Sequence, residues 1–118
     1  MKKIEIVKKN SDFDKIIQKN QCKKDDIIII YYLDNEMKKN RFGISVGKKI
    51  GNAVVRNYYK RVIRNICDSY KNLYSNGKDY IIILRKGVKM LSYQEIEEHF
   101  LTLMKKIKKD ERIIINEE

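Results

Sequence analysis

The chain changes from a strand pattern to a helical pattern within residues 41–70, which read RFGISVGKKIGNAVVRNYYKRVIRNICDSY. In the first part, apolar residues alternate with small ones, and this period of two predicts a β-strand covered on one face. The other face carries only Gly and Ser, which lets a packed neighbour or a ligand approach the backbone closely. The apolar face has Phe42, Ile44 and Val46, and the bare face has Gly43, Ser45 and Gly47.

A helix follows the strand. Gly51 ends the alternation, and Asn52 is a good N-cap because its side-chain oxygen can accept a first-turn N–H. Projected at about 100° per residue, the helix from Ala53 has an apolar stripe facing a core and a basic face pointing outward. The stripe comprises Val55, Tyr59, Val62, Ile63, Ile66 and Tyr70; the basic face comprises Arg56, Asn57, Lys60, Arg61 and Arg64.

Two interpretations of the basic face are open. The simpler one is a solvated helix surface, but such surfaces normally carry acids that relieve like-charge repulsion. Here there is no Asp or Glu between Met37 and Cys67, and three of the four cations are Arg although Lys is commoner in the chain. Because the Arg fork grips phosphate in two places, this choice favours phosphate contacts.

The composition narrows the class of partner. The 118 residues contain no Pro and carry a formal charge of +11, with a pI near 9.6. We expect one domain, residues 1–118, that binds a polyanion. An acidic membrane surface is the alternative, but the basic helix has no bulky apolar wedge to enter lipid. No apolar run is long enough for a bilayer span or a signal peptide, which predicts a cytoplasmic protein; Cys22 and Cys67 are expected to be reduced thiols.

The other elements follow from periodicity. Residues 11–20 predict a short amphipathic helix, and residues 27–33 and 80–84 predict buried strands. The polar residues 34–40 should join the first of these strands antiparallel to the next, and Asn76-Gly77 marks a turn. A capping box, Ser92-Tyr93-Gln94-Glu95, starts a last helix. Its expected core residues are Ile96, Phe100, Leu103, Met104 and Ile107, while residues 113–118 have no assigned structure.

The stretch SVGKKIGNAVVRNYYKRVIR resembles the signature of the protein subunit of bacterial ribonuclease P, in which an Arg-Asn-Arg-type motif follows a KKIGNAV-type turn. The match is close over residues 42–64 and looser over most of the chain. It departs at Tyr58, where the family motif has a second Arg. The resemblance implies an α+β fold in the order αβββαβα: a two-layer sandwich of packed helices on a four-stranded sheet, with a short strand near residues 21–24 and a left-handed βαβ crossover.

The resemblance also implies a function. In that family the RNA subunit cleaves the phosphodiester with Mg2+ held by RNA and substrate, while the protein binds the catalytic RNA and the 5′ leader of precursor tRNA. The protein would be the non-catalytic subunit of an RNA-based endoribonuclease, with no membrane or protein partner implied. The RNA-binding residues would be Lys48, Lys49, Arg56, Asn57, Lys60, Arg61 and Arg64; the leader cleft would use Phe13, Ile17, Tyr31 and Ser45.

Phe13 and Tyr31 could equally be core residues, and Ile17 replaces what is often a second Phe in the family's cleft. Ile offers contact area but no π-face for a base.

Side-chain catalysis has little support in the sequence. The one histidine, His99, falls on the polar side of the last helix and is expected to be solvated. The acids do not have a spacing typical of a metal site, and residues 47–51 lack the length and the Ser/Thr of a P-loop. No catalytic or metal-binding residue is therefore predicted. The alternatives to a ribonuclease P subunit are a structural RNA-binding protein, such as a ribosomal protein, and a self-sufficient nuclease.

Overall fold

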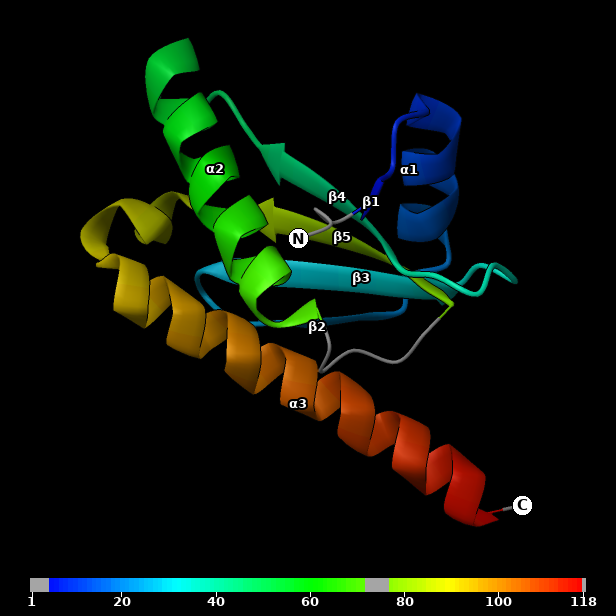
Figure 1. Cartoon of the computed structure of the whole chain (residues 1–118). Coiled ribbons are helices and arrows are strands. Elements are labelled where there is room, and N and C mark those ends of the chain that lie inside the picture. Colours follow the sequence, from blue (N-terminus) through cyan, green and yellow to red (C-terminus); the bar gives the residue numbers. More distant parts are fainter. Residues whose placement is uncertain (1–4, 72–76, 118) are drawn as a thin grey trace.

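A computed structural model describes residues 5–71 and 77–117, with side chains as far as Lys109. The fold is α+β, as predicted, with helices on both faces of one sheet (Figure 1). The elements are β1 (Glu5–Ile6), α1 (Asn10–Gln18), β2 (Cys22–Lys24), β3 (Ile28–Asp34), β4 (Arg41–Val46), α2 (Ala53–Ser69), β5 (Lys78–Leu84), the 3-10 helix η2 (Lys86–Met90) and α3 (Tyr93–Glu117).

The sheet has five strands in the order β1-β4-β5-β3-β2, one more than the four expected. The extra strand, β1, pairs in parallel with the first two residues of β4. β2 is the short strand that the resemblance predicted. β3 and β4 run in opposite directions, as expected of the loop between them, but they are not neighbours because β5 lies between them. β5 is apolar on both faces and both are buried. The central position in the sheet therefore removes the most apolar surface of this strand from water.

The unit β4-α2-β5 joins two neighbouring parallel strands through a helix. In Figure 1 α2 lies in front of the sheet, both strands point to the left, and β5 lies below β4. That arrangement is a left-handed crossover, whereas nearly all such units are right-handed. The handedness implied by the family resemblance is therefore confirmed.

The main core fills the space between the sheet and the two helices α2 and α3. Phe42 and Val46 of β4 point into it, and the Phe42 ring stacks on Tyr80 with 5.3 Å between centroids. The capping box of α3 is present, because Ser92 and Glu95 exchange hydrogen bonds of 3.0 and 3.2 Å. The expected core residues of α3 are all buried: Ile96, Phe100, Leu103, Met104 and Ile107.

Both cysteines are free thiols, as expected. Cys67 is fully buried in the main core, and burial raises the pKa of its thiol.

The α3 helix continues to Glu117, through residues for which the sequence predicted no structure. Of the predicted Asn76-Gly77 turn, Asn76 lies outside the described residues, and Gly77 has φ +85°. None of the helices in the described part of the chain is long and apolar enough to cross a bilayer.

α1 packs on the opposite face of the sheet and forms a second, smaller core. Val7, Ile16 and Ile81 are buried there. The close approach depends on Gly43, because a Cβ at this position would lie 2.5 Å from Cζ of Phe13 and 2.6 Å from Cδ1 of Ile81. The sequence indicated a bare face on β4, and at Gly43 this face is where α1 packs.

We predict that Gly43→Ala destabilises the fold whereas Gly47→Ala does not. The added methyl at position 43 would force Phe13 or Ile81 aside, and such overpacking costs about 1–3 kcal/mol. At Gly47 no heavy atom lies within 4 Å of the added Cβ, so this variant is the matched control. Urea unfolding of both variants measures the difference, and equal midpoints would contradict the close contact.

Candidate nucleic-acid interface

The start of α2 is fixed by the two residues before it. The side chain of Asn52 accepts a hydrogen bond of 3.1 Å from the Val55 N–H, which confirms the predicted N-cap. A Cβ on Gly51 would lie 2.8 Å from the Val55 side chain, so the chain needs a glycine to enter the helix this closely. The helix then buries its apolar stripe around Ile63 and Ile66. This packing turns the basic face outward.

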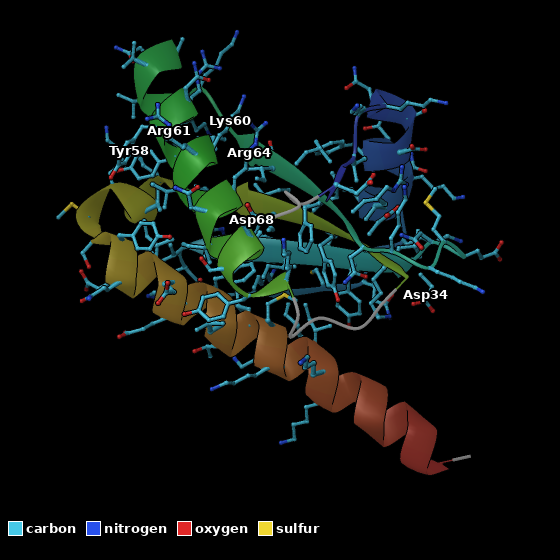
Figure 2. All side chains as sticks on the ribbon, viewed as in Figure 1. Asp34, Tyr58, Lys60, Arg61, Arg64 and Asp68 are labelled. Atoms are coloured by element: carbon cyan, nitrogen blue, oxygen red, sulfur yellow. The ribbon has the colours of Figure 1, made fainter. Side chains whose placement is uncertain are left out.

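The basic face carries no acid as far as Cys67; the first is Asp68, one turn after Arg64, and it pairs with Lys71. Asn57, Arg61 and Arg64 are exposed, whereas Arg56 and Lys60 are half-buried. Figure 2 shows Lys60 and Arg64 on one flank of α2 and Arg61 on the other. Arg56, Lys60, Arg61 and Arg64 form no ion pair with any residue that the structure describes.

Arg56 has a feature that sets it apart from the other cations. Its Nε is buried and has no hydrogen-bond partner among the described residues. A buried donor without a partner costs about 1–3 kcal/mol. Because the atom is covered, an external acceptor such as a phosphate oxygen could reach it only after the side chain turned outward.

Lys48 and Lys49 extend the positive surface at the N-terminal end of α2. They lie in the turn after β4, which is closed by a 3.1 Å hydrogen bond from the Ile50 N–H to the Gly47 carbonyl. Both side chains are exposed. The turn connects the end of β4 to the start of α2, so these lysines stand where the strand meets the basic helix.

The predicted cleft residues gather on the α1 face of the sheet. Phe13, Ile17 and Tyr31 all pack, half-buried, around the smaller core. Strand register sets Gly43, Ile81, Tyr31 and Cys22 side by side in one row across the sheet, and Ser45, Ile83, Ile29 and Lys24 in the next. Phe13 of α1 lies over Gly43 in the first row. The second row is not fully covered, since none of its four side chains is buried.

The two predicted RNA-binding surfaces are therefore on opposite faces of the sheet. α2 packs on the main core and α1 on the smaller one, so the basic face and the cleft residues do not come together. β4 is common to both, because its apolar side chains support α2 and its bare face lies beneath α1.

Sequence patterns did not predict an ion pair at the other end of β4, in which Asp79 is buried and Arg41 is half-buried. Arg41 donates to Asp79 from Nε at 2.8 Å and from Nη2 at 2.6 Å, and its Nη1 lies 3.5 Å from Asp12. Asn35 donates to the same Asp79 carboxylate at 2.8 Å. The hydrogen bond to Asp79 raises the pKa of Arg41 above its ordinary value. The only sequence signal was that both residues stand at the start of a strand.

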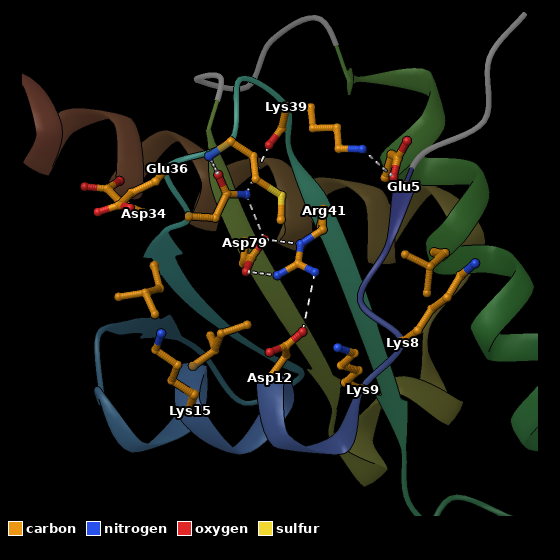
Figure 3. Close-up of a pocket in the computed structure, with 15 residues that line it drawn as sticks. Glu5, Lys8, Lys9, Asp12, Lys15, Asp34, Glu36, Lys39, Arg41 and Asp79 are labelled. Carbon is orange, nitrogen blue, oxygen red and sulfur yellow. Dashed lines mark hydrogen bonds and ion pairs between the residues drawn. The ribbon is translucent and has the colours of Figure 1, made fainter.

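This ion pair forms part of the wall of a pocket of about 660 Å³ beside α1 (Figure 3). The pocket is lined by both signs of charge, and several acids are already engaged: Glu5 pairs with Lys39 at 3.2 Å and Asp34 with Lys78 at 2.6 Å. The network ties α1, the loop after β3, β4 and β5 together. Its evident role is to hold these elements in register.

The expectation that His99 is solvated holds only in part, since its side chain is 36% exposed and also has a partner. Its Nδ1 lies 2.7 Å from Oδ2 of Asp25, whose other oxygen accepts from the N–H groups of Ile27 and Ile28 at 2.8 and 2.9 Å. Burial tends to raise the pKa of Asp25, but these hydrogen bonds outweigh it and lower that pKa. His99 thus joins α3 to the turn before β3. Among the described residues, no three His, Cys, Asp or Glu side chains gather in a metal-binding group.

Comparison with known proteins gives concordant matches. The family described as Ribonuclease P matches residues 1–108. The "Ribonuclease P protein component" of Mycoplasma mycoides subsp. mycoides SC is 44% identical over 109 residues, covering 92% of this chain and 100% of that protein. The component from Bacillus cereus (strain B4264) is 40% identical over 115 residues, with coverage of 92% and 100%.

Solved structures agree with the sequence matches. The RNase P protein of Staphylococcus aureus has a TM-score of 0.82 and 36% identity, covering 90% of this chain and 97% of that one. The RNase P protein from Thermotoga maritima has a TM-score of 0.79 and 27% identity, with coverage of 86% and 96%.

Proposed function

This chain belongs to the ribonuclease P protein family, and on that premise we propose that it binds a catalytic RNA and the 5′ leader of precursor tRNA. It then assists endonucleolytic removal of the leader in the cytoplasm. The chemistry is carried by the RNA, with Mg2+ held by that RNA and the substrate. The side chains of this protein bind and position the two RNAs.

The observation that carries the proposal is the unpaired basic face of α2. Four cations with no acid among them before Asp68 repel one another, and this cost is recovered when each meets a phosphate. Each neutralised phosphate also releases counterions, so binding weakens as salt rises, with a slope of about −0.7 to −0.9 per contact.

Placing the two surfaces on opposite faces of the sheet suits a protein that holds two RNAs at once. The catalytic RNA lies against α2, with Lys48 and Lys49 at the edge of that contact. The leader lies against the α1 face, where Phe13 and Tyr31 offer aromatic rings and Ile17 adds apolar area. Ser45 lies in the adjoining row, where its small side chain leaves room for the RNA leader. Stacking on aromatic rings tolerates any base, which suits varied leaders.

The experiment that tests the proposal is cleavage of a 5′-labelled precursor tRNA at low Mg2+ by a bacterial ribonuclease P RNA, with and without this protein. We expect the protein to raise the cleavage rate and to be inert alone. Tight RNA binding without any rate increase would instead indicate a structural RNA-binding protein. Cleavage by the protein without added RNA would indicate a self-sufficient nuclease.

We predict that the double variant Arg56→Ala/Arg61→Ala binds the catalytic RNA more weakly. Loss of two phosphate contacts should make the slope of log K against log salt shallower by about 1.4 to 1.8. Lys105→Ala/Lys106→Ala, which removes the same charge from exposed positions on α3, is the matched control and should change the slope less. Filter binding over a salt series measures both. An unchanged slope in the first variant would exclude the basic face as the RNA contact.

We predict that Phe13→Leu/Tyr31→Leu weakens binding to precursor tRNA in the holoenzyme but spares mature tRNA without a leader. Leucine retains apolar bulk for the smaller core but has no π-face, and each lost stack costs about 1–3 kcal/mol. Leu33→Ala, in the same core but without a ring to lose, controls for packing. Equal losses on both substrates would mean that Phe13 and Tyr31 serve only as core.

A further inference from the structure

Tyr58 is an aromatic residue left open on the helix that carries the basic face. Its side chain is 51% exposed, although large aromatic rings are usually covered. The ring meets Tyr59 edge to face, with centroids 5.1 Å apart and planes at 80°. This contact holds the ring from one side and leaves the rest accessible. The family signature has Arg at this position, so the role of Tyr58 does not follow from the resemblance.

The surroundings of Tyr58 differ from those of an ordinary surface tyrosine. Residues three, four and seven positions away share its flank of the helix. They are Val54, which is 78% exposed, and the exposed Arg61 and Asn65. Figure 2 shows Tyr58 and Arg61 on the flank of α2 away from Lys60 and Arg64. An open ring, an apolar side chain, a guanidinium and an amide therefore lie together with no acid among them.

We propose that Tyr58 is an RNA-contact residue whose ring stacks on an unpaired base of the catalytic RNA, while Arg61 holds a phosphate beside that base. The inference rests on the proposed function and identifies the kind of RNA element that binds to the Tyr58 flank of α2. Bases within an A-form duplex are stacked on one another, whereas bases in loops and bulges can be splayed onto aromatic side chains. The contact thus calls for a single-stranded feature, next to the phosphates that the rest of the basic face holds.

A second copy of this chain fits the same flank poorly. A symmetric contact through Tyr58 would place Arg61 of one copy close to Arg61 of the other. Among the described residues of the flank there is no acid to neutralise them, and each copy carries +11. RNA brings the opposite charge and an aromatic base, so it complements both the cation and the ring.

A tyrosine and an arginine at this position would have different effects on the affinity for RNA and on its salt dependence. The ring carries no charge, so removing it should lower affinity without changing the salt dependence. We expect Tyr58→Ala to weaken binding to the catalytic RNA by about 5- to 150-fold, the range for one lost base–aromatic stack, at every salt concentration. Tyr58→Phe should bind as the native protein does. Tyr58→Arg should make the salt slope steeper by about 0.7 to 0.9.

A spectroscopic test follows from the absence of Trp in the chain. Tyr58→Trp places a single Trp on the proposed contact, and stacking of a base on the indole should quench its emission. Tyr93→Trp is the matched control, because Tyr93 is also exposed, at 39%, but lies on α3. We expect the RNA to quench the first variant strongly and the second weakly. Circular dichroism and urea unfolding confirm that each variant is folded.

The outcomes separate this inference from the proposed function. Loss of affinity in Tyr58→Ala at constant slope, with selective quenching in Tyr58→Trp, supports the inference. Native affinity of Tyr58→Ala for an RNA that the native protein does bind and activate overturns it and leaves the proposed function standing. A change in self-association of Tyr58→Ala, measured by sedimentation, with unchanged RNA affinity also overturns it. Failure of the native protein to bind the RNA would instead defeat the proposed function.

Discussion

The contact of Phe13 with the bare backbone of Gly43 is the constraint on which the arrangement of the two proposed RNA-binding surfaces depends. It lets α1 lie close on one face of the sheet while the alternate side chains of the same strand, Phe42 and Val46, fill the main core on the other. The two faces of β4 thus pack against different helices. A larger residue at position 43 would lift α1 and, with it, the proposed cleft.

The cations of α2 are tolerated because the packing beneath them is apolar and deep. Ile63 and Ile66 are fully buried, and the free energy of their burial offsets the repulsion between the cations on the outer face of the helix. Charge that is unpaired within the chain destabilises the free protein and attracts a polyanion. In this protein the two effects have one cause, so a substitution that relieves repulsion on α2 would also weaken the proposed attraction to RNA.

Much of the fold could be predicted from local patterns, because α2, α3 and β4 each have a clear period and the two helices also have capping signals. The basic face followed directly from the helical projection of Arg56, Lys60, Arg61 and Arg64. The ion pair of Arg41 with Asp79 was not predicted, because the sequence indicated a βαβ unit but not the strand register that sets Arg41 opposite Asp79. The partner of His99 was missed because Asp25 lies in a turn far away in the sequence. The site contacts with RNA rest on the family resemblance and remain predictions.

The short pairing of β1 has a consequence for self-association. β1 covers only Arg41 and Phe42, so in the described part of the chain no strand pairs with the outer edge of residues 44–46. An uncovered edge offers backbone donors and acceptors to any other strand, which is a route to aggregation. Lys48 and Lys49 follow this edge directly, and two copies approaching through it would bring like charges together. The two lysines proposed to contact RNA would thus also disfavour edge-to-edge pairing between copies of this protein.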